Sequence, residues 1–164
     1  MGEMIGKALK YGDNINTDII SPPQYMELSI SEASVYSMSA VDPDFSKRVS
    51  PGDFFVAVHN LGSGSSRETS PLTLKYLGIN CIIACSYARI FYRNCINVGI
   101  VPLICGDADR INDNDRLRVD AETGRIVNMT KNESYQCETL PDHIMDIIKA
   151  GGLFLYLKHE REAE

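Results

Sequence analysis

The sequence predicts a single α/β domain that spans residues 1–164. A chain of this length falls within the usual range for one domain, and 44% hydrophobic residues are enough to build its core. Between residues 54 and 104, short apolar runs alternate with helix-like segments, which predicts parallel strands joined by right-handed crossovers. Beyond residue 115, short strand-like runs follow one another and predict a β-meander.

Strands are predicted where apolar and β-branched residues form short runs bounded by turn residues. The clearest run is Phe54 to Val58, which follows the turn Pro51-Gly52-Asp53 and contains no charged residue. We expect it to form a buried strand. The full set of expected strands is residues 4–11, 54–58, 80–86, 100–104, 116–120, 125–129 and 134–138.

The stretch between the first two strands predicts a turn, a loop and one short helix. Its two adjacent prolines, Pro22 and Pro23, forbid a regular helix start. A serine-capped helix is expected after them, with Ser29 or Ser31 as the cap. In order, we expect a turn at 12–14, a loop with a polar centre at 15–20 and a helix at 31–38.

A helix is also expected after the glycine-serine loop, which we define as residues 62–68. Ser65 or Ser66 is predicted to cap this helix, Glu68 to lie in its first turn and Gly78 to end it. Pro71 is tolerated only if the helix starts near residue 69 or 70. Its candidate buried positions are Leu72, Leu74, Tyr76 and Leu77. Further helices are expected at 87–98 and 142–150, and residues 153–157 fit either a strand or a helix.

Charge and cysteine content exclude several classes of protein. A net charge of -6, spread along the chain, provides no basic face for nucleic acid. The five cysteines include no C-x-x-C pair, so we expect reduced, mostly buried thiols and no metal site. Because no basic-then-apolar leader opens the sequence and no apolar run approaches about 20 residues, we expect a cytoplasmic protein.

The glycine-serine loop has the composition of an anion-binding site. Backbone N–H groups, serine hydroxyls and a following helix start favour an anion, and Arg67 adds a bidentate donor for carboxylate or phosphate. Arg67 also breaks both the dinucleotide fingerprint and the P-loop, and Gly64 breaks the nucleophile elbow G-x-S-x-G. On pattern alone, a solvated glycine-rich turn that caps a helix is an equal alternative.

Three motifs in the right order resemble one known family. The segment Asn60 to Glu68 resembles the corresponding motif in the small subunits of isopropylmalate dehydratases and in the swivelling domain of aconitase. Residues 12–20 resemble the N-terminal signature of this family, and 86–99 resemble its second signature. With the closing segment 150–153, the resemblance covers essentially the whole chain.

The resemblance implies a three-layer β/β/α swivelling fold that works with a separate large subunit. That partner would carry a [4Fe-4S] cluster whose iron activates the leaving hydroxyl, so this chain would bind no cofactor itself. The implied reaction removes water from a 2-hydroxy acid and re-adds it at the neighbouring carbon. The resemblance leaves open whether the isolated chain forms a homo-oligomer.

The resemblance also implies catalytic roles for three residues. Ser65 matches the base that removes a carbon-bound proton, and Arg67 matches the arginine that binds substrate carboxylate and assists this serine. Asp18 matches an aspartate that orients a histidine of the large subunit, although an ordinary turn or capping role is its alternative. Ser66 and Gly64 are expected beside the substrate.

Other polar residues near these motifs have structural explanations. Glu68 is expected to stabilise the first turn of a helix, and Arg89 and Arg93 to hold loops or the interface. His59 adjoins the loop, but a lone histidine is more often structural.

Substrate choice is expected to depend on the loop after the first motif, whose side chains include Tyr25, Met26, Glu27 and Leu28. Relatives of the homoaconitase and aconitase type hold an extra carboxylate with an arginine here. Glu27 would repel such a carboxylate, whereas Met26 and Leu28 offer apolar contact, which favours a branched malate.

The sequence departs from the usual family pattern at two places. His59-Asn60-Leu61-Gly62-Ser63-Gly64 stands where Glu-Asn-Phe-Gly-Cys-Gly is common, and Cys95 replaces a usual alanine. The leading hypothesis is the isomerisation of 2-isopropylmalate to 3-isopropylmalate in leucine biosynthesis. The alternatives are a dehydratase of the dimethylmalate, methylmalate/citraconate or homoaconitase type, or a non-catalytic anion-binding module of the same fold.

Overall fold

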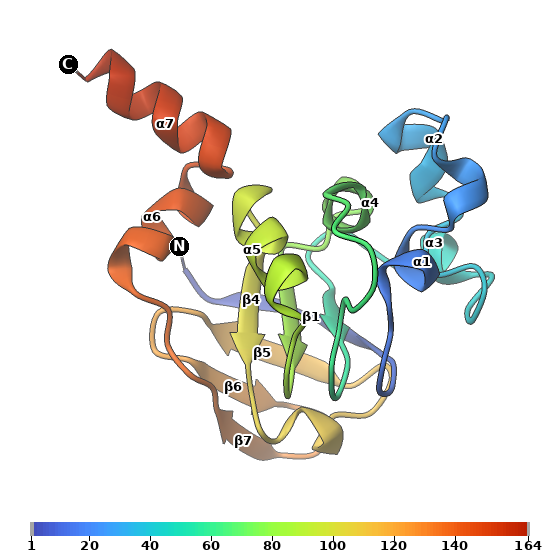
Figure 1. The fold of residues 1–164 in the computed structure, drawn as a ribbon. Helices are drawn as coiled ribbons and strands as arrows, with labels where there is room; N and C mark the ends of the chain where they lie inside the picture. The colour runs from blue at the N-terminus through green and yellow to red at the C-terminus, as the bar shows by residue number, and fades with distance from the viewer. Residues whose placement is uncertain (1, 164) are drawn as a thin grey trace.

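A seven-stranded sheet in the order β4-β3-β2-β1-β5-β6-β7 organises residues 2–163, which are the residues that this computed structural model describes (Figure 1). The strands follow the sequence prediction closely, because each lies inside a short apolar or alternating run. Their bounds are β1 (Met4–Lys10), β2 (Phe54–Val56), β3 (Cys81–Ala84), β4 (Val101–Ile104), β5 (Arg116–Asp120), β6 (Arg125–Asn128) and β7 (Glu133–Gln136).

Strand β1 belongs to both halves of the sheet. Its residues 8–10 pair in parallel with β2, which continues through β3 to β4. Its residues 4–7 pair antiparallel with β5, which leads to the meander of β6 and β7. Near this division, a Cβ atom on Gly6 would lie 2.5 Å from the carbonyl oxygen of Gly52. The absence of a side chain at residue 6 therefore lets the chain before β2 approach β1.

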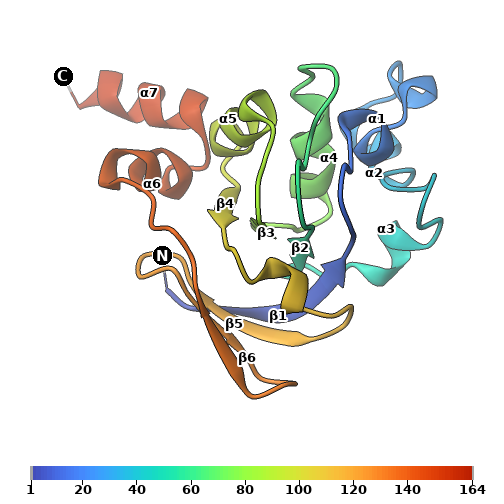
Figure 2. The ribbon, with the colours of Figure 1, turned by 60° about the horizontal axis from the view of Figure 1, so that its bottom comes forward.

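The helices cover the parallel strands on one side, and the antiparallel strands lie on the other side (Figure 2). Helices α4 and α5 are the crossovers of the parallel sheet, so the predicted alternation of strands and helices is confirmed. The predicted β/β/α layering is confirmed as well. The helices are α1 (Thr17–Ile20), η1 (Pro23–Tyr25), α2 (Ile30–Ser34), α3 (Phe45–Arg48), α4 (Thr69–Tyr76), α5 (Arg89–Asn97), η2 (Ala108–Arg110), α6 (Asp142–Lys149) and α7 (Leu153–Glu162).

Two hydrophobic cores flank the parallel sheet, and the side chains of successive strand residues point alternately into one core and the other. In β2, Phe54 and Val56 face the antiparallel strands, whereas Phe55 and the following Ala57 face the helices. Because side chains alternate across a strand, a sheet that is covered on both faces needs apolar residues at every position. This requirement explains why β2, β3 and β4 read as unbroken apolar runs.

Two local predictions were wrong at their boundaries. Residues 15–20 do not form a loop throughout, because Asn16 accepts a hydrogen bond from the Ile19 amide (2.9 Å) and caps α1. Helix α2 does begin after its predicted cap Ser29, but it ends at residue 34, and the chain turns sharply at Met38 with a φ of 61°.

Helix α4 starts at Thr69 rather than directly after the predicted serine caps. Pro71 lacks an amide hydrogen and therefore lies within the first turn, where helical N–H groups need no intrahelical partner. Leu74 is buried as expected, but Tyr76 is 60% exposed. The ambiguous segment after residue 152 is a helix, α7, which extends from the body of the molecule (Figure 1). No helix within residues 2–163 is long and apolar enough to cross a membrane.

The central aromatic residue Phe55 generates a prediction about stability. Its ring is fully buried, stacks on Tyr11 at 5.2 Å between centroids and meets Phe45 edge-on at 6.0 Å. Phe55→Ala leaves a cavity in the helix-side core, so we expect the free energy of unfolding to fall by about 3–5 kcal/mol. Urea unfolding of the purified chain measures this change. The control is Phe154→Ala, which truncates a ring that is 78% exposed and is expected to change stability by less than about 0.5 kcal/mol. Equal effects of the two variants would contradict the assignment of Phe55 to the core.

Candidate functional site

The segments after β1 and β2 run back side by side toward the helix layer (Figure 1). Backbone hydrogen bonds connect them along their length, so their polar side chains are held in a fixed relation. These bonds run from Asn14 N to His59 O (2.9 Å), from Gly62 N to Ile15 O (2.7 Å) and from Thr17 N to Ser63 O (2.8 Å). The first and second motifs of the sequence therefore lie together.

The third motif joins them through a close contact at Gly62. This residue has a φ of 85°, and a Cβ atom there would lie 2.1 Å from Cγ of Phe91 in α5. Next to it, Leu61 N donates to Ser86 O (3.1 Å), and Ala88 N donates to Leu61 O (2.9 Å). Glycine is thus required at residue 62 for both its backbone conformation and its packing.

Thr17 connects α1 to the predicted base, Ser65. Its hydroxyl donates to the backbone carbonyl of Ser65 (3.0 Å) and lies 3.4 Å from Oγ of the same serine. Thr17 is itself buried and fixed, because Ser70 Oγ donates to its carbonyl (3.2 Å). Gly64, with a φ of 105°, leaves room for this arrangement, since a Cβ atom there would come within 3.1 Å of Thr17 Oγ1.

Arg67 and Asp18 form an ion pair beside this contact. Nη2 of Arg67 donates to Oδ1 of Asp18 at 2.5 Å, and their side chains are 19% and 57% exposed, respectively. Nε of Arg67 is buried and has no hydrogen-bond partner among residues 2–163. A buried N–H group without a partner is unfavourable and uncommon in native structures. This donor is therefore left unsatisfied within the described residues.

The glycine-serine loop differs from the prediction in one respect that affects its chemistry. Because α4 begins at Thr69, the exposed Ser65 and Ser66 precede the helix and do not cap it. Glu68 occupies the cap position without a capping side-chain bond. The positive end of the α4 dipole is therefore not at Ser65, and the local positive charge comes from the guanidinium of Arg67.

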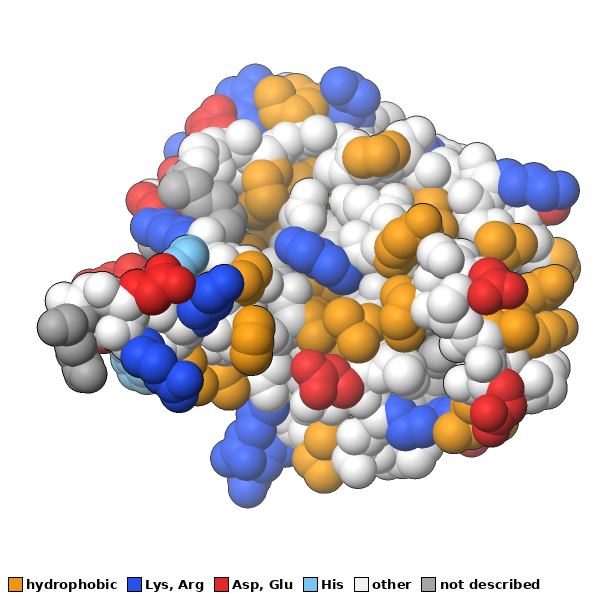
Figure 3. Space-filling view, turned by 90° about the horizontal axis from the view of Figure 1, so that it is seen from above, with side chains coloured by type: hydrophobic (Ala, Val, Ile, Leu, Met, Phe, Trp, Pro, Cys, Tyr) orange, Lys and Arg blue, Asp and Glu red, His pale blue; other side chains and the backbone are white. Residues whose placement is uncertain are grey.

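The predicted specificity loop lies on the helix side, where apolar side chains reach the surface in several patches (Figure 3). Met26 is 59% exposed, Leu28 is 38% exposed, and Glu27 also faces solvent. Tyr25 is half-buried because its ring stacks on that of Tyr36, with 3.9 Å between centroids and 6° between planes. The structure thus brings Asp18, Ser65 and Arg67 together but does not bury residues 26–28 against them.

His59 holds the start of the loop. Its backbone N–H and its Nδ1 both contact Oδ1 of Asp13, at 2.9 and 3.0 Å. The backbone hydrogen bond, followed by that from the ring, lowers the pKa of the Asp13 carboxyl. Both side chains are more than half exposed.

The five cysteines are free thiols. Cys85 is half-buried and the other four are buried, and burial raises the pKa of the Cys95 thiol well above its usual value. No three His, Cys, Asp or Glu side chains are grouped as a metal site in the part of the chain that the structure describes. Buried thiols of this kind act as small apolar residues.

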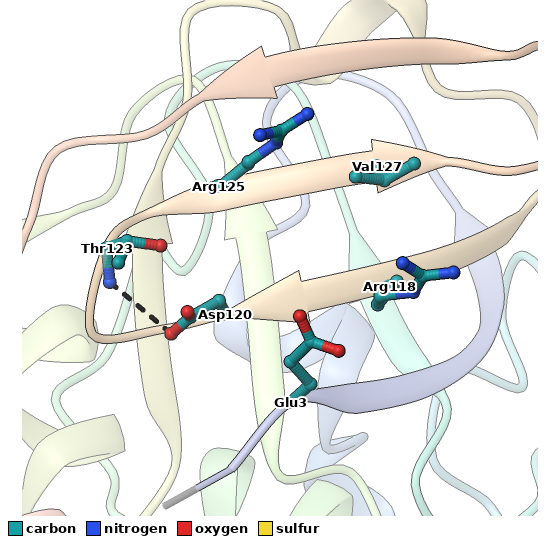
Figure 4. A pocket seen from close by; sticks show the side chains of 6 residues that line it. All are labelled: Glu3, Arg118, Asp120, Thr123, Arg125 and Val127. Atoms are coloured by element: carbon teal, nitrogen blue, oxygen red, sulfur yellow. Dashed lines mark hydrogen bonds between the residues drawn. The ribbon is translucent and has the colours of Figure 1, made fainter.

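A separate hollow of about 220 Å³ lies on the outer face of the antiparallel strands (Figure 4). Its lining shares no residue with the predicted site. Arg118 and Arg125 are accompanied there by Glu3 and Asp120, so the charges balance and no anion is favoured. The polar cluster around Arg67 is the better candidate, because its residues come from two segments that are distant in sequence and include a buried donor.

Comparisons with known proteins identify the family of the chain. Residues 7–107 match the family described as Aconitase C-terminal domain. The 3-isopropylmalate dehydratase small subunit of Methanosarcina acetivorans is 46% identical over 156 residues, which are 94% of this chain and 96% of that protein. The isopropylmalate/citramalate isomerase small subunit of Methanocaldococcus jannaschii is 47% identical over 155 residues, or 93% of this chain and 92% of that one.

A solved structure extends the similarity to three dimensions. The crystal structure of a 3-isopropylmalate dehydratase chain from Methanocaldococcus jannaschii matches with a TM-score of 0.94 and 41% identity. The match covers 98% of this chain and 96% of the other. On sequence and structure together, this chain belongs to the family of 3-isopropylmalate dehydratase small subunits, whose fold is the aconitase C-terminal domain.

Proposed function

We propose that residues 1–164 act as one swivelling domain, the small subunit of a hydro-lyase that isomerises 2-isopropylmalate to 3-isopropylmalate in leucine biosynthesis. The observation that carries this proposal is the convergence of Thr17-Asp18 with Ser65 and Arg67. These residues are about fifty positions apart in sequence, yet they are linked by a hydrogen bond and an ion pair. The family to which the chain belongs supplies the reaction class.

Ser65 is the proposed base. Dehydration removes a proton from one carbon and hydroxide from its neighbour, and rehydration returns water with the two positions exchanged. Oγ of Ser65 would take the carbon-bound proton and later return it. A serine hydroxyl is a weak base unless its deprotonated form is stabilised. Thr17 Oγ1 lies 3.4 Å from Ser65 Oγ and could stabilise that form if its single hydrogen turned from the Ser65 carbonyl to Oγ.

Arg67 is the proposed carboxylate ligand. A guanidinium can hold a carboxylate with two parallel hydrogen bonds, and it fixes the orientation of the reacting carbons. The buried, unpartnered Nε supports this role, because a bound carboxylate would satisfy it. The positive charge of Arg67 also favours the deprotonated form of Ser65, two residues away in the chain.

Asp18 is the proposed contact to a histidine of the large subunit. Its carboxylate is more than half exposed and accepts from Arg67 through one oxygen, Oδ1. A carboxylate at this surface can hold an imidazolium by a charge-assisted hydrogen bond. The proposed site is therefore completed by a second chain.

The proposed partner is a large subunit that carries a [4Fe-4S] cluster. The donor set on this chain does not fit such a cluster: the thiols are buried and spread over both cores, and they form no group of three within residues 2–163. The names of the relatives as small subunits agree with a two-chain enzyme.

The specificity loop supports a branched, dicarboxylate substrate. Met26 and Leu28 present apolar surface, and no lysine or arginine occurs between Lys10 and Lys47. A third carboxylate of the kind that homoaconitase-type enzymes bind would meet Glu27 without a local cation. Methylmalate and citraconate remain the second candidate pair, because a 47% identical relative is named for both isopropylmalate and citramalate.

Reconstitution tests the proposed function directly. We expect the chain to co-purify with a cluster-bearing large subunit encoded by the same genome. The anaerobic mixture should hydrate isopropylmaleate, measured as loss of absorbance of its carbon–carbon double bond. Each chain alone serves as the control. If the chain binds dicarboxylates but never confers hydratase activity on the partner, it is a non-catalytic anion-binding module.

Ser65→Ala tests the base. We expect kcat to fall by about 10²- to 10⁴-fold, the usual contribution of a positioned acid–base group, with assembly unchanged. Steady-state kinetics and size-exclusion chromatography of the complex measure the two properties. The matched control is Ser134→Ala, at an exposed position of β7, which should leave both unchanged. Near-normal turnover by Ser65→Ala would show that another group removes the proton.

Arg67→Lys tests the carboxylate ligand. Lysine keeps the charge but cannot form the bidentate pair, so we expect kcat/KM to fall roughly 10- to 100-fold. Arg125→Lys, on the outer face of the antiparallel sheet, is the control with the same chemical change. Equal kinetics for the two variants and the wild type would exclude direct contact between Arg67 and substrate.

A further inference from the structure

The loop that follows α1 folds on itself through local hydrogen bonds. Met26 N donates to Pro23 O (3.2 Å), and Leu28 N donates to Tyr25 O (3.2 Å). Such bonds define the shape of the loop, but they do not determine where it lies relative to Asp18 and Arg67. Pro22 is buried directly after α1, and beyond it the ring of Tyr25 anchors the loop by stacking face to face on the ring of Tyr36.

Tyr36 is anchored to α1, the helix that contains Asp18, through the two residues that follow it. The next two residues, Ser37 and Met38, are buried and both bind the carbonyl of Ile20, through Ser37 Oγ (2.9 Å) and Met38 N (3.2 Å). Ile20 ends α1, the helix that contains Asp18. A short, fixed path therefore leads from Asp18 through Ile20 to the ring of Tyr36.

The exposed apolar side chains of the loop depend on this path. Met26 and Leu28 are more than one third exposed, so packing in the core does not fix them. Their position follows from that of Tyr25, which lies one residue before Met26. An apolar recognition surface selects a substrate well only when it is held in place before binding, because ordering it later costs conformational entropy.

We propose that Tyr36 is a positioning residue for substrate selection, which acts by stacking on Tyr25 and so fixes the loop of Met26 and Leu28 relative to α1, the helix that carries Asp18. This inference rests on the proposed function and deepens it. Tyr36 itself does not touch the substrate. Its removal should weaken recognition of the branched substituent while the chemistry at Ser65 and Arg67 continues.

Kinetics of the reconstituted two-subunit enzyme test this proposal. For Tyr36→Ala we expect KM for isopropylmaleate to rise about three- to tenfold, the loss expected from one aromatic stack. We expect kcat to stay within about twofold, because the proton-transfer groups are unchanged. The preference for isopropylmaleate over methylmaleate, measured as the ratio of kcat/KM values, should fall by a similar factor.

Three further variants separate positioning from a general effect on folding. Tyr36→Phe keeps the stacking ring and is expected to restore both KM and the preference. Tyr76→Ala removes a tyrosine that is 60% exposed at the end of α4 and is expected to behave as the wild type. Tyr36→Leu fills most of the volume without a stacking ring, and it replaces Tyr36→Ala if that variant does not assemble.

Several results would overturn the proposal. Unchanged KM and preference in an assembled Tyr36→Ala enzyme would do so, as would a Tyr36→Phe variant as impaired as Tyr36→Ala. A fall in kcat alone, or failure of both Tyr36→Ala and Tyr36→Leu to assemble, would assign Tyr36 a purely structural role. An inactive wild-type pair would instead refute the proposed function, and the inference with it.

Discussion

Burial of the parallel strands on both faces is the constraint on which the rest of the structure depends. Each strand has to supply apolar side chains to two cores, as Phe54 and Phe55 do in β2. Polar residues are consequently excluded from the strands and concentrated in the connections. The chain must run beyond the carboxyl ends of β1 and β2 before it can turn, and both connections then return along the same route to the helix layer.

This shared route is what creates the candidate site. The two returning connections have no strand of their own, so they satisfy their backbone groups by binding each other, from Asn14–His59 to Thr17–Ser63. Gly62 permits the close approach to α5 that completes the arrangement. The ion pair between Asp18 and Arg67 is then a result of the backbone geometry. An exposed ion pair of this type contributes little to stability, which is compatible with its replacement by substrate or partner groups.

Much of the fold could be predicted because its signals are local. Unbroken apolar runs such as Phe54 to Val58 identified the buried strands, and the glycines at 78 and 99 marked the ends of α4 and α5. The restriction that Pro71 places on the first turn predicted the start of α4 at residue 69 or 70, whereas the serine caps suggested an earlier one that the structure does not show. The short helix α1 was missed because four residues show no periodicity, although Asn16 is a good cap.

The site was predictable only as a set of segments. Asp18, Ser65 and Arg67 were identified by resemblance, and their proximity in the structure agrees with that identification. Thr17 and Tyr36 were not singled out, because their importance depends on contacts with residues distant in sequence or across a turn. The dipeptide Thr17-Asp18 gave no local signal of this contact, because the burial of the Thr17 hydroxyl is visible only in the structure.

The division of β1 between two halves of the sheet has a consequence for the variation that this strand can tolerate. A methyl group at residue 6 would overlap the carbonyl of Gly52, whereas Ile5 is half exposed and pairs with the exposed Arg118. If the strand were randomised and selected for folding, neighbouring positions would behave in opposite ways. Residue 5 would accept many side chains, and residue 6 would be selected as glycine, since one added carbon there would push the segment before β2 away from β1.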